Sequence, residues 1–87
     1  MTKTTFGATF SDGVTIKRNS NRDYEAAFIK RVQGPNGTYE VAGFSRSRAL
    51  AERALATEVN RTAKFAQTAR GAGHTVIFSE VADTFRL

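Results

Sequence analysis

One long segment with helical periodicity, residues 45–70, limits the folds that are open to this chain. Its apolar residues recur at helical spacing on one face, and most of them are small. The predicted buried stripe contains Ala51, Leu55, Val59, Thr62, Ala66 and Ala69, flanked by Ala54 and Phe65. A lone helix with one apolar stripe must cover another element, and small side chains let it lie close to a sheet. Ser45 or Ser47 is placed to cap its N-terminus, and Gly71 and Gly73 end it.

The first twenty residues predict a β-hairpin. Residues 6–10 and 14–18 both alternate apolar and polar side chains, as strands with one buried face do. Between them we expect a three-residue loop, Ser11-Asp12-Gly13, with Gly13 in the left-handed conformation. This loop opposes Ala8 to Ile16 and collects all the apolar side chains on one face of the hairpin.

A second hairpin is predicted around the turn Gly34-Pro35-Asn36-Gly37, between strands at residues 23–33 and 38–44. A three-residue loop here opposes Phe28 to Phe44. The face that we expect to meet the helix then holds Tyr24, Ala26, Phe28, Val32, Ala42 and Phe44.

The opposite face of the second hairpin is mixed, so its apolar residues Ile29 and Val41 either need cover or form part of a binding surface. Residues 75–81 predict a final strand, and residues 82–87 either a helical turn or an extension of that strand.

Two charged residues conflict with this burial pattern. Glu58 falls near the middle of the buried helix stripe, and Lys30 lies on the sheet face that should meet it. We therefore predict that these two side chains pair with each other. Leu50 points away from the stripe and is expected at the surface.

Together these patterns predict an α+β fold of one domain, residues 1–87, in strand–helix order ββββαβ. We expect one antiparallel sheet of four to five strands with the long helix packed across one face. The chain has no Cys, no long apolar run and no signal-peptide core at its start. We therefore expect a soluble, cytoplasmic protein.

The charge of the chain points to an anionic partner. Its formal net charge is +5 and its pI is about 10.3, which is typical of domains that bind nucleic acid or another polyanion. On the expected helix, Arg46, Arg53, Arg61 and Lys64 share one face with polar residues and no carboxylate. Because solvated helix surfaces usually mix both signs, a surface of one sign suggests a partner of opposite charge.

Further candidate contacts lie on the predicted sheet. Arg18 and Arg22 flank the turn Asn19-Ser20-Asn21 and form a basic, amide-rich tip suited to phosphate contacts. On the outer sheet face, Arg31, Gln33 and Tyr39 are candidates for stacking on bases or hydrogen bonding to them. The complete set of candidate binding residues is Arg18, Arg22, Arg31, Gln33, Tyr39, Arg46, Arg53, Arg61 and Lys64.

Catalysis is poorly supported by the sequence. His74 is the only histidine and is expected in an exposed loop, and the acidic residues show no metal-ligand spacing. The segment Gly34-Pro35-Asn36-Gly37 lacks the strand–loop–helix setting of a phosphate loop, so we interpret it as a hairpin turn. We expect a non-enzymatic protein without cofactor or metal.

From Tyr24 to Gly71 the chain resembles two related DNA-binding modules, the plant ethylene-response-factor domain and the arm-type N-terminal domain of tyrosine integrases. Tyr24-Glu25-Ala26-Ala27-Phe28-Ile29-Lys30-Arg31 is similar to their aromatic–x–Ala–x–Ile–Arg strand, and Asn36-Gly37 to the following turn. Gly43-Phe44-Ser45 before an alanine-rich helix, with Ala49, Ala51 and Ala54, also resembles them. The resemblance implies DNA binding by the sheet, with Arg18, Arg31, Gln33 and Tyr39 as contacts.

The leading hypothesis is therefore a small basic module that binds nucleic acid, DNA in preference to RNA. The alternative is a phage-type inhibitor, similar in size and style to anti-CRISPR proteins, that binds an acidic or nucleic-acid-binding protein. Such an inhibitor would use the same basic helix face.

Overall fold

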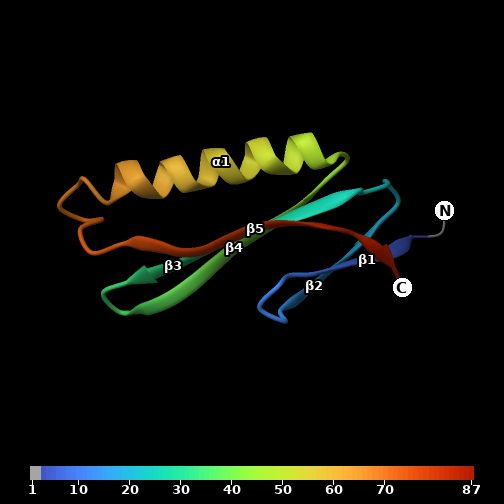
Figure 1. Cartoon of the computed structure of the whole chain (residues 1–87), viewed down its shortest axis with the longest axis horizontal. Coiled ribbons are helices and arrows are strands. Elements are labelled where there is room, and N and C mark those ends of the chain that lie inside the picture. The colour runs from blue at the N-terminus through green and yellow to red at the C-terminus, as the bar shows by residue number, and fades with distance from the viewer. Residues whose placement is uncertain (1–2) are drawn as a thin grey trace.

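The chain forms two three-stranded antiparallel sheets and one helix (Figure 1). The computed structural model describes residues 3–87. Its elements are β1 (Thr4–Thr9), β2 (Thr15–Ser20), β3 (Ala26–Gly34), β4 (Gly37–Ser45), α1 (Arg48–Phe65), β5 (Thr75–Asp83) and β6 (Phe85–Arg86). The small sheet has the strand order β2-β1-β6 and the large sheet the order β4-β3-β5.

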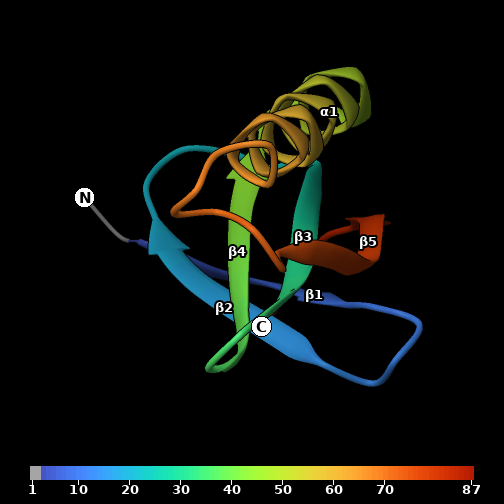
Figure 2. The same ribbon diagram turned by 90° about the vertical axis from the view of Figure 1, so that its left-hand side faces the viewer.

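Strand β3 lies at the centre of the molecule and is covered on both faces. On one face Ala27 and Ile29 are fully buried in a cluster with Ala8 and Phe10 from the first hairpin. On the other face the Lys30 side chain reaches α1. Figure 2 shows the resulting three layers, with α1 above β3 and β4 and with β1 and β2 below them.

The α+β class is confirmed, but the expectation of one four-to-five-stranded sheet is wrong. The first hairpin does not extend the large sheet. It packs its apolar face against Ala27 and Ile29, so the face that the sequence left without cover is covered by the hairpin itself. Burying two apolar faces against each other removes more apolar surface from water than placing them side by side in one sheet.

The first hairpin loop is as predicted. The amide of Phe10 donates to the carbonyl oxygen of Val14 at 2.9 Å, and Ala8 lies opposite Ile16. Gly13 has a φ of +90°, a conformation that side-chain-bearing residues rarely adopt.

The predicted register of the second hairpin is wrong by one residue. Gly34 pairs with Gly37, which places Phe28 opposite Gly43 and Ala27 opposite Phe44. A Cβ atom at Gly43 would lie 2.8 Å from the Phe28 ring, so the glycine provides the space that this ring occupies. Phe44 consequently packs against the core between the two sheets, rather than against the helix as predicted.

Helix α1 begins as predicted and ends earlier. Ser47 caps it, because its side-chain oxygen accepts a hydrogen bond from the amide of Leu50 at 3.2 Å. The helix stops at Phe65, five residues before the predicted end at Arg70. The chain folds back there, since a Cβ at Gly71 would lie 1.8 Å from the Phe65 carbonyl oxygen.

The predicted helix stripe packs on the large sheet, except at its last position. Ala51 and Thr62 are buried, and the remaining stripe residues within or next to the helix are half-buried. Ala69 lies beyond the helix and is exposed, and Leu50 is exposed as predicted.

The predicted pair between Lys30 and Glu58 is confirmed. The ammonium group lies 3.1 Å from the Glu58 carboxylate and also donates to the Thr62 hydroxyl at 2.9 Å. Lys30 is only 3% exposed, so these acceptors satisfy a charge that has almost no access to water.

The last strand extends further than predicted and then changes sheet. β5 pairs with β3, so α1 connects the two parallel edge strands β4 and β5 across the sheet. After Thr84, β6 pairs with β1, and the Phe85 ring lies over Gly7. Among residues 3–87, no helix has the length and apolar content needed to cross a bilayer.

Phe28→Ala should lower the free energy of unfolding by about 3–5 kcal/mol, because it removes a buried ring on the helix side of β3. Denaturant unfolding followed by circular dichroism measures this change. An unchanged midpoint would contradict the burial of Phe28.

Lys30→Met should destabilise the fold by about 1–3 kcal/mol, because the Glu58 carboxylate and the Thr62 hydroxyl lose their buried donor. The double variant Lys30→Met/Glu58→Met should recover much of the loss, since an apolar pair replaces the ion pair. Equal stabilities of the wild type and the Lys30→Met variant would show that the pair contributes nothing.

Candidate nucleic-acid interface

Ion pairs within the fold neutralise most of the acidic side chains. Every Asp and Glu of the chain except Glu25 and Glu80 lies in an ion pair with a lysine or arginine. Glu80 instead accepts a hydrogen bond from the Ser11 amide at 2.7 Å. The cations that these pairs use are Lys30, Arg31, Arg48, Arg61 and Arg86.

The other cations have no ion-pair partner within residues 3–87. They are Lys3, Lys17, Arg18, Arg22, Arg46, Arg53, Lys64 and Arg70. Those up to Arg22 lie in or beside β1 and β2, and those from Arg46 onward lie on α1 or flank it. The positive charge available to a partner is therefore divided between the small sheet and the helix.

The solvent face of α1 carries three of the four basic residues that the sequence predicted there, Arg53, Arg61 and Lys64, whereas Arg46 lies before the helix. Arg53 and Lys64 are exposed, and a shallow hollow of about 340 Å³ is lined by Thr57, Asn60, Arg61 and Lys64. Arg61 shares the Glu58 carboxylate at 3.0 Å, yet 69% of its side chain remains exposed. No carboxylate lines this hollow, so it presents only positive and neutral polar groups.

Arg31 and Tyr39 do not share a surface, which corrects the prediction. Tyr39 lies opposite Val32 on the helix side of the large sheet, whereas Arg31 lies opposite Glu40 on the other side. The one-residue difference in register is the reason, because it turns every β4 side chain to the opposite face.

Arg31 is held between two carboxylates and is not available to a phosphate. Its guanidinium lies 2.5 Å from the Asp12 carboxylate and 2.9 Å from that of Glu40. Hydrogen bonds to Asp12 and then to Glu40 raise the pKa of the Arg31 guanidinium. The same contact lowers the pKa of the Asp12 carboxyl below its usual value of 3.8. We assign Arg31 a structural role, joining the first hairpin loop to the large sheet.

The remaining candidates are spread over a molecule that is 47 Å long. The Arg18 guanidinium lies 5.4 Å from the centre of the Tyr24 ring, and Arg22 is exposed in the bend after β2. This bend and the C-terminal end of α1 lie at opposite ends of the molecule (Figure 1). Gln33 is exposed near the β3–β4 turn, and Arg46 is exposed before α1. The structure thus keeps Arg53, Arg61 and Lys64 together on the helix, and it brings Tyr39 to a hollow that Arg61 also lines.

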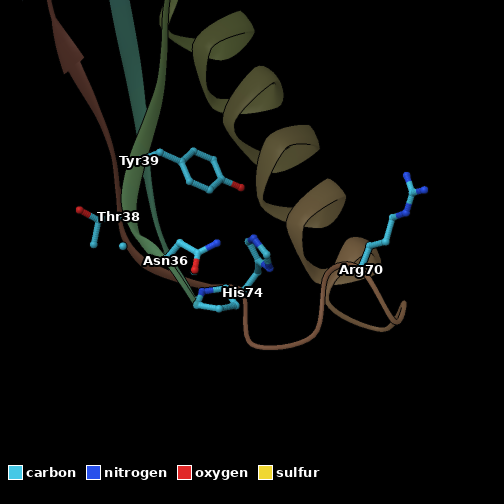
Figure 3. A pocket seen from close by; sticks show the side chains of 8 residues that line it. Asn36, Thr38, Tyr39, Arg70 and His74 are labelled. Atoms are coloured by element: carbon cyan, nitrogen blue, oxygen red, sulfur yellow. The ribbon is translucent and has the colours of Figure 1, made fainter.

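A pocket at the C-terminal end of α1 was not predicted. Figure 3 shows it between Tyr39, Asn36 and His74, with Arg70 at its edge. Its volume is about 270 Å³, and one wall is formed by the predicted hairpin turn, residues 34–37, together with Thr38 and Tyr39.

His74 is half-buried in this pocket rather than exposed as predicted. Its Nδ1 lies 2.8 Å from the Gly71 carbonyl oxygen, which can only accept, so Nδ1 carries a proton. Its ring centre lies 5.0 Å from that of Phe65 and 6.3 Å from that of Tyr39. The one sequence feature that hints at this position of His74 is the glycine at residue 34. A Cβ atom there would lie only 3.2 Å from His74 Nε2, so the glycine lets the imidazole lie close to the β3–β4 turn.

Within residues 3–87, the structure contains no cluster of three or more His, Cys, Asp or Glu side chains able to hold a metal ion. The lining of the pocket around His74 includes the Tyr39 ring and the Asn36 amide, and it contains no carboxylate. Its hydroxyl groups are those of Thr38 and Tyr39.

Acidification should destabilise the fold through Asp12. A carboxyl group whose pKa is lowered by folding stabilises the folded state above its unfolded pKa, and that stabilisation is lost as the pH falls through the folded value. The melting temperature should therefore decrease below a pH of about 4, and Asp12→Asn should weaken this decrease. The same pH dependence in both proteins would argue against the Asp12–Arg31 contact.

No protein-family model matches the chain, and neither the comparison with curated proteins nor that with solved structures finds a match.

Proposed function

We propose that this protein is a non-enzymatic, cytoplasmic nucleic-acid-binding module that contacts phosphates through the solvent face of α1. The supporting observation is the distribution of charge. Most acidic side chains lie in ion pairs with cations of the fold, whereas Arg53 and Lys64 are exposed on α1 without an ion-pair partner, and Lys64 lines a hollow that no carboxylate lines. Cations arranged in this way displace counterions from a phosphate backbone, which is the main source of sequence-independent affinity.

The helix is a better candidate than the large sheet. In the DNA-binding modules that the chain resembles, the sheet is the reading surface. Here the small sheet packs on the face of β3 that carries Ala27 and Ile29, and Arg31 on that face is paired with two acids. The helix face is solvent-exposed along its length and has no comparable internal partner for Arg53 or Lys64.

The alternative function is that of a phage-type inhibitor that binds an acidic surface of another protein through the same helix face. A pull-down from lysate with and without nuclease separates the two functions. A nucleic-acid-binding module loses its partners on digestion, whereas an inhibitor retains a protein partner.

Affinity for a 20-nucleotide DNA should fall roughly 10- to 100-fold between about 50 and 200 mM salt, because each phosphate contact releases a counterion. Arg53→Glu/Lys64→Glu should weaken binding and reduce the slope of log K against log salt by about 2. Fluorescence anisotropy with labelled DNA, taken as single strand and as duplex, measures both quantities.

Lys3→Glu/Lys17→Glu is the matched control, because it changes the net charge equally but lies away from the helix face, with Lys17 in β2 and Lys3 directly before β1. This control should retain most of the affinity. If both double variants lose affinity equally, the helix face is not the site. If neither DNA form binds at 50 mM salt, the proposed function is wrong.

A further inference from the structure

Three hollows adjoin one another between the solvent face of α1 and the β3–β4 turn. The first is the hollow on the solvent face of the helix. The second, of about 200 Å³, is also lined by Arg61, together with Tyr39 and Phe65. The second shares Tyr39 with the pocket around His74. We call this continuous surface the α1–β4 track.

Aromatic side chains are exposed along the α1–β4 track. Tyr39 is 45% exposed and Phe65 is 40% exposed, although both have large apolar surfaces that are normally buried. His74 contacts both rings edge-on, with interplanar angles of 62° to Tyr39 and 65° to Phe65. Its hydrogen bond to Gly71 fixes the imidazole, so the exposed rings lie against a fixed support.

The charge along the α1–β4 track has a single sign. Its three hollows are lined by the cations Lys30, Arg61, Lys64 and Arg70 and by no aspartate or glutamate. Lys30 is buried and satisfied by Glu58 and Thr62. Arg61 shares the Glu58 carboxylate but keeps 69% of its side chain exposed, so Arg61, Lys64 and Arg70 can face a ligand. Cations therefore lie on both sides of the exposed rings along the track.

We infer that the α1–β4 track binds single-stranded nucleic acid, with bases stacked on Tyr39 and Phe65 and phosphates contacted by Arg61, Lys64 and Arg70. This inference rests on the proposed function and names its substrate class. Exposed rings between cations are the arrangement by which proteins hold single strands, because every base has a face that can stack. A duplex hides those faces within its own base stack, so the rings would contribute nothing to its binding.

The size of the terminal pocket agrees with a base as its occupant. At about 270 Å³ it is smaller than typical sites for whole small molecules, roughly 300–1,000 Å³. The Asn36 amide lines it and offers both a donor and an acceptor to a base edge. A flat base that enters from the second hollow would meet Tyr39 first and then the Asn36 amide.

Fluorescence anisotropy with a 20-nucleotide DNA strand and with its duplex tests the inference. The single strand should bind at least about fivefold more tightly than the duplex. Tyr39→Ala should weaken single-strand binding by about tenfold and leave duplex binding unchanged, since it removes one stacking surface. Tyr39→Phe keeps the ring and should bind within about threefold of the wild type.

Ile77→Ala is the matched control, because Ile77 is 51% exposed on β5, the opposite edge strand of the same sheet. It should leave both affinities unchanged, and Tyr39→Leu provides a second ring-free variant should Tyr39→Ala fail to fold. Equal or tighter duplex binding, or an unchanged single-strand affinity in both ring-free variants, would overturn the inference while the proposed function stands. Absence of binding to either DNA form at low salt would instead remove the proposed function itself.

Discussion

The burial of β3 on both faces is the constraint on which the rest of the structure depends. The apolar stripe of α1 and the apolar face of the first hairpin have no partner other than the two faces of this strand and its neighbours. Neither outer layer buries enough surface to stand alone, since a small domain has little core to spare. Covering both faces also buries Lys30, and this charge is tolerated because Glu58 and Thr62 on the helix accept its hydrogen bonds.

The same layering decides which charges remain available. Packing the first hairpin against the large sheet brings Asp12 to Arg31, and strand pairing brings Glu40 to the other side of the same guanidinium. An arginine that would be a phosphate contact on an open sheet becomes an internal link between layers. The outward positive charge is then divided between the small sheet and the helix, and on the helix the exposed cations Arg53 and Lys64 have no such partners.

A chain reversal after the helix creates the aromatic group at its C-terminal end. Because the chain folds back over Phe65 at Gly71, His74 returns beneath the helix and contacts the rings of Phe65 and Tyr39. These residues come from α1, the following loop and β4, which are far apart in the sequence. Their proximity converts isolated surface aromatics into a supported group beside basic residues, which is the basis of the proposed single-strand site.

Local spacing in the sequence was sufficient for the hairpin loop at Gly13, the one-signed helix face and the Lys30–Glu58 pair, because each follows from turn chemistry or from the period of one element. It narrowed the helix cap to Ser45 or Ser47, and the structure selects Ser47. The division into two sheets, the register of β4 and the side on which Tyr39 lies were not predictable in this way. Strand β3 is apolar on both faces, so alternation did not indicate which face meets which layer or whether a two- or three-residue turn is correct. Only the packing of Phe28 over Gly43, and of the first hairpin over Ile29, decided between these registers.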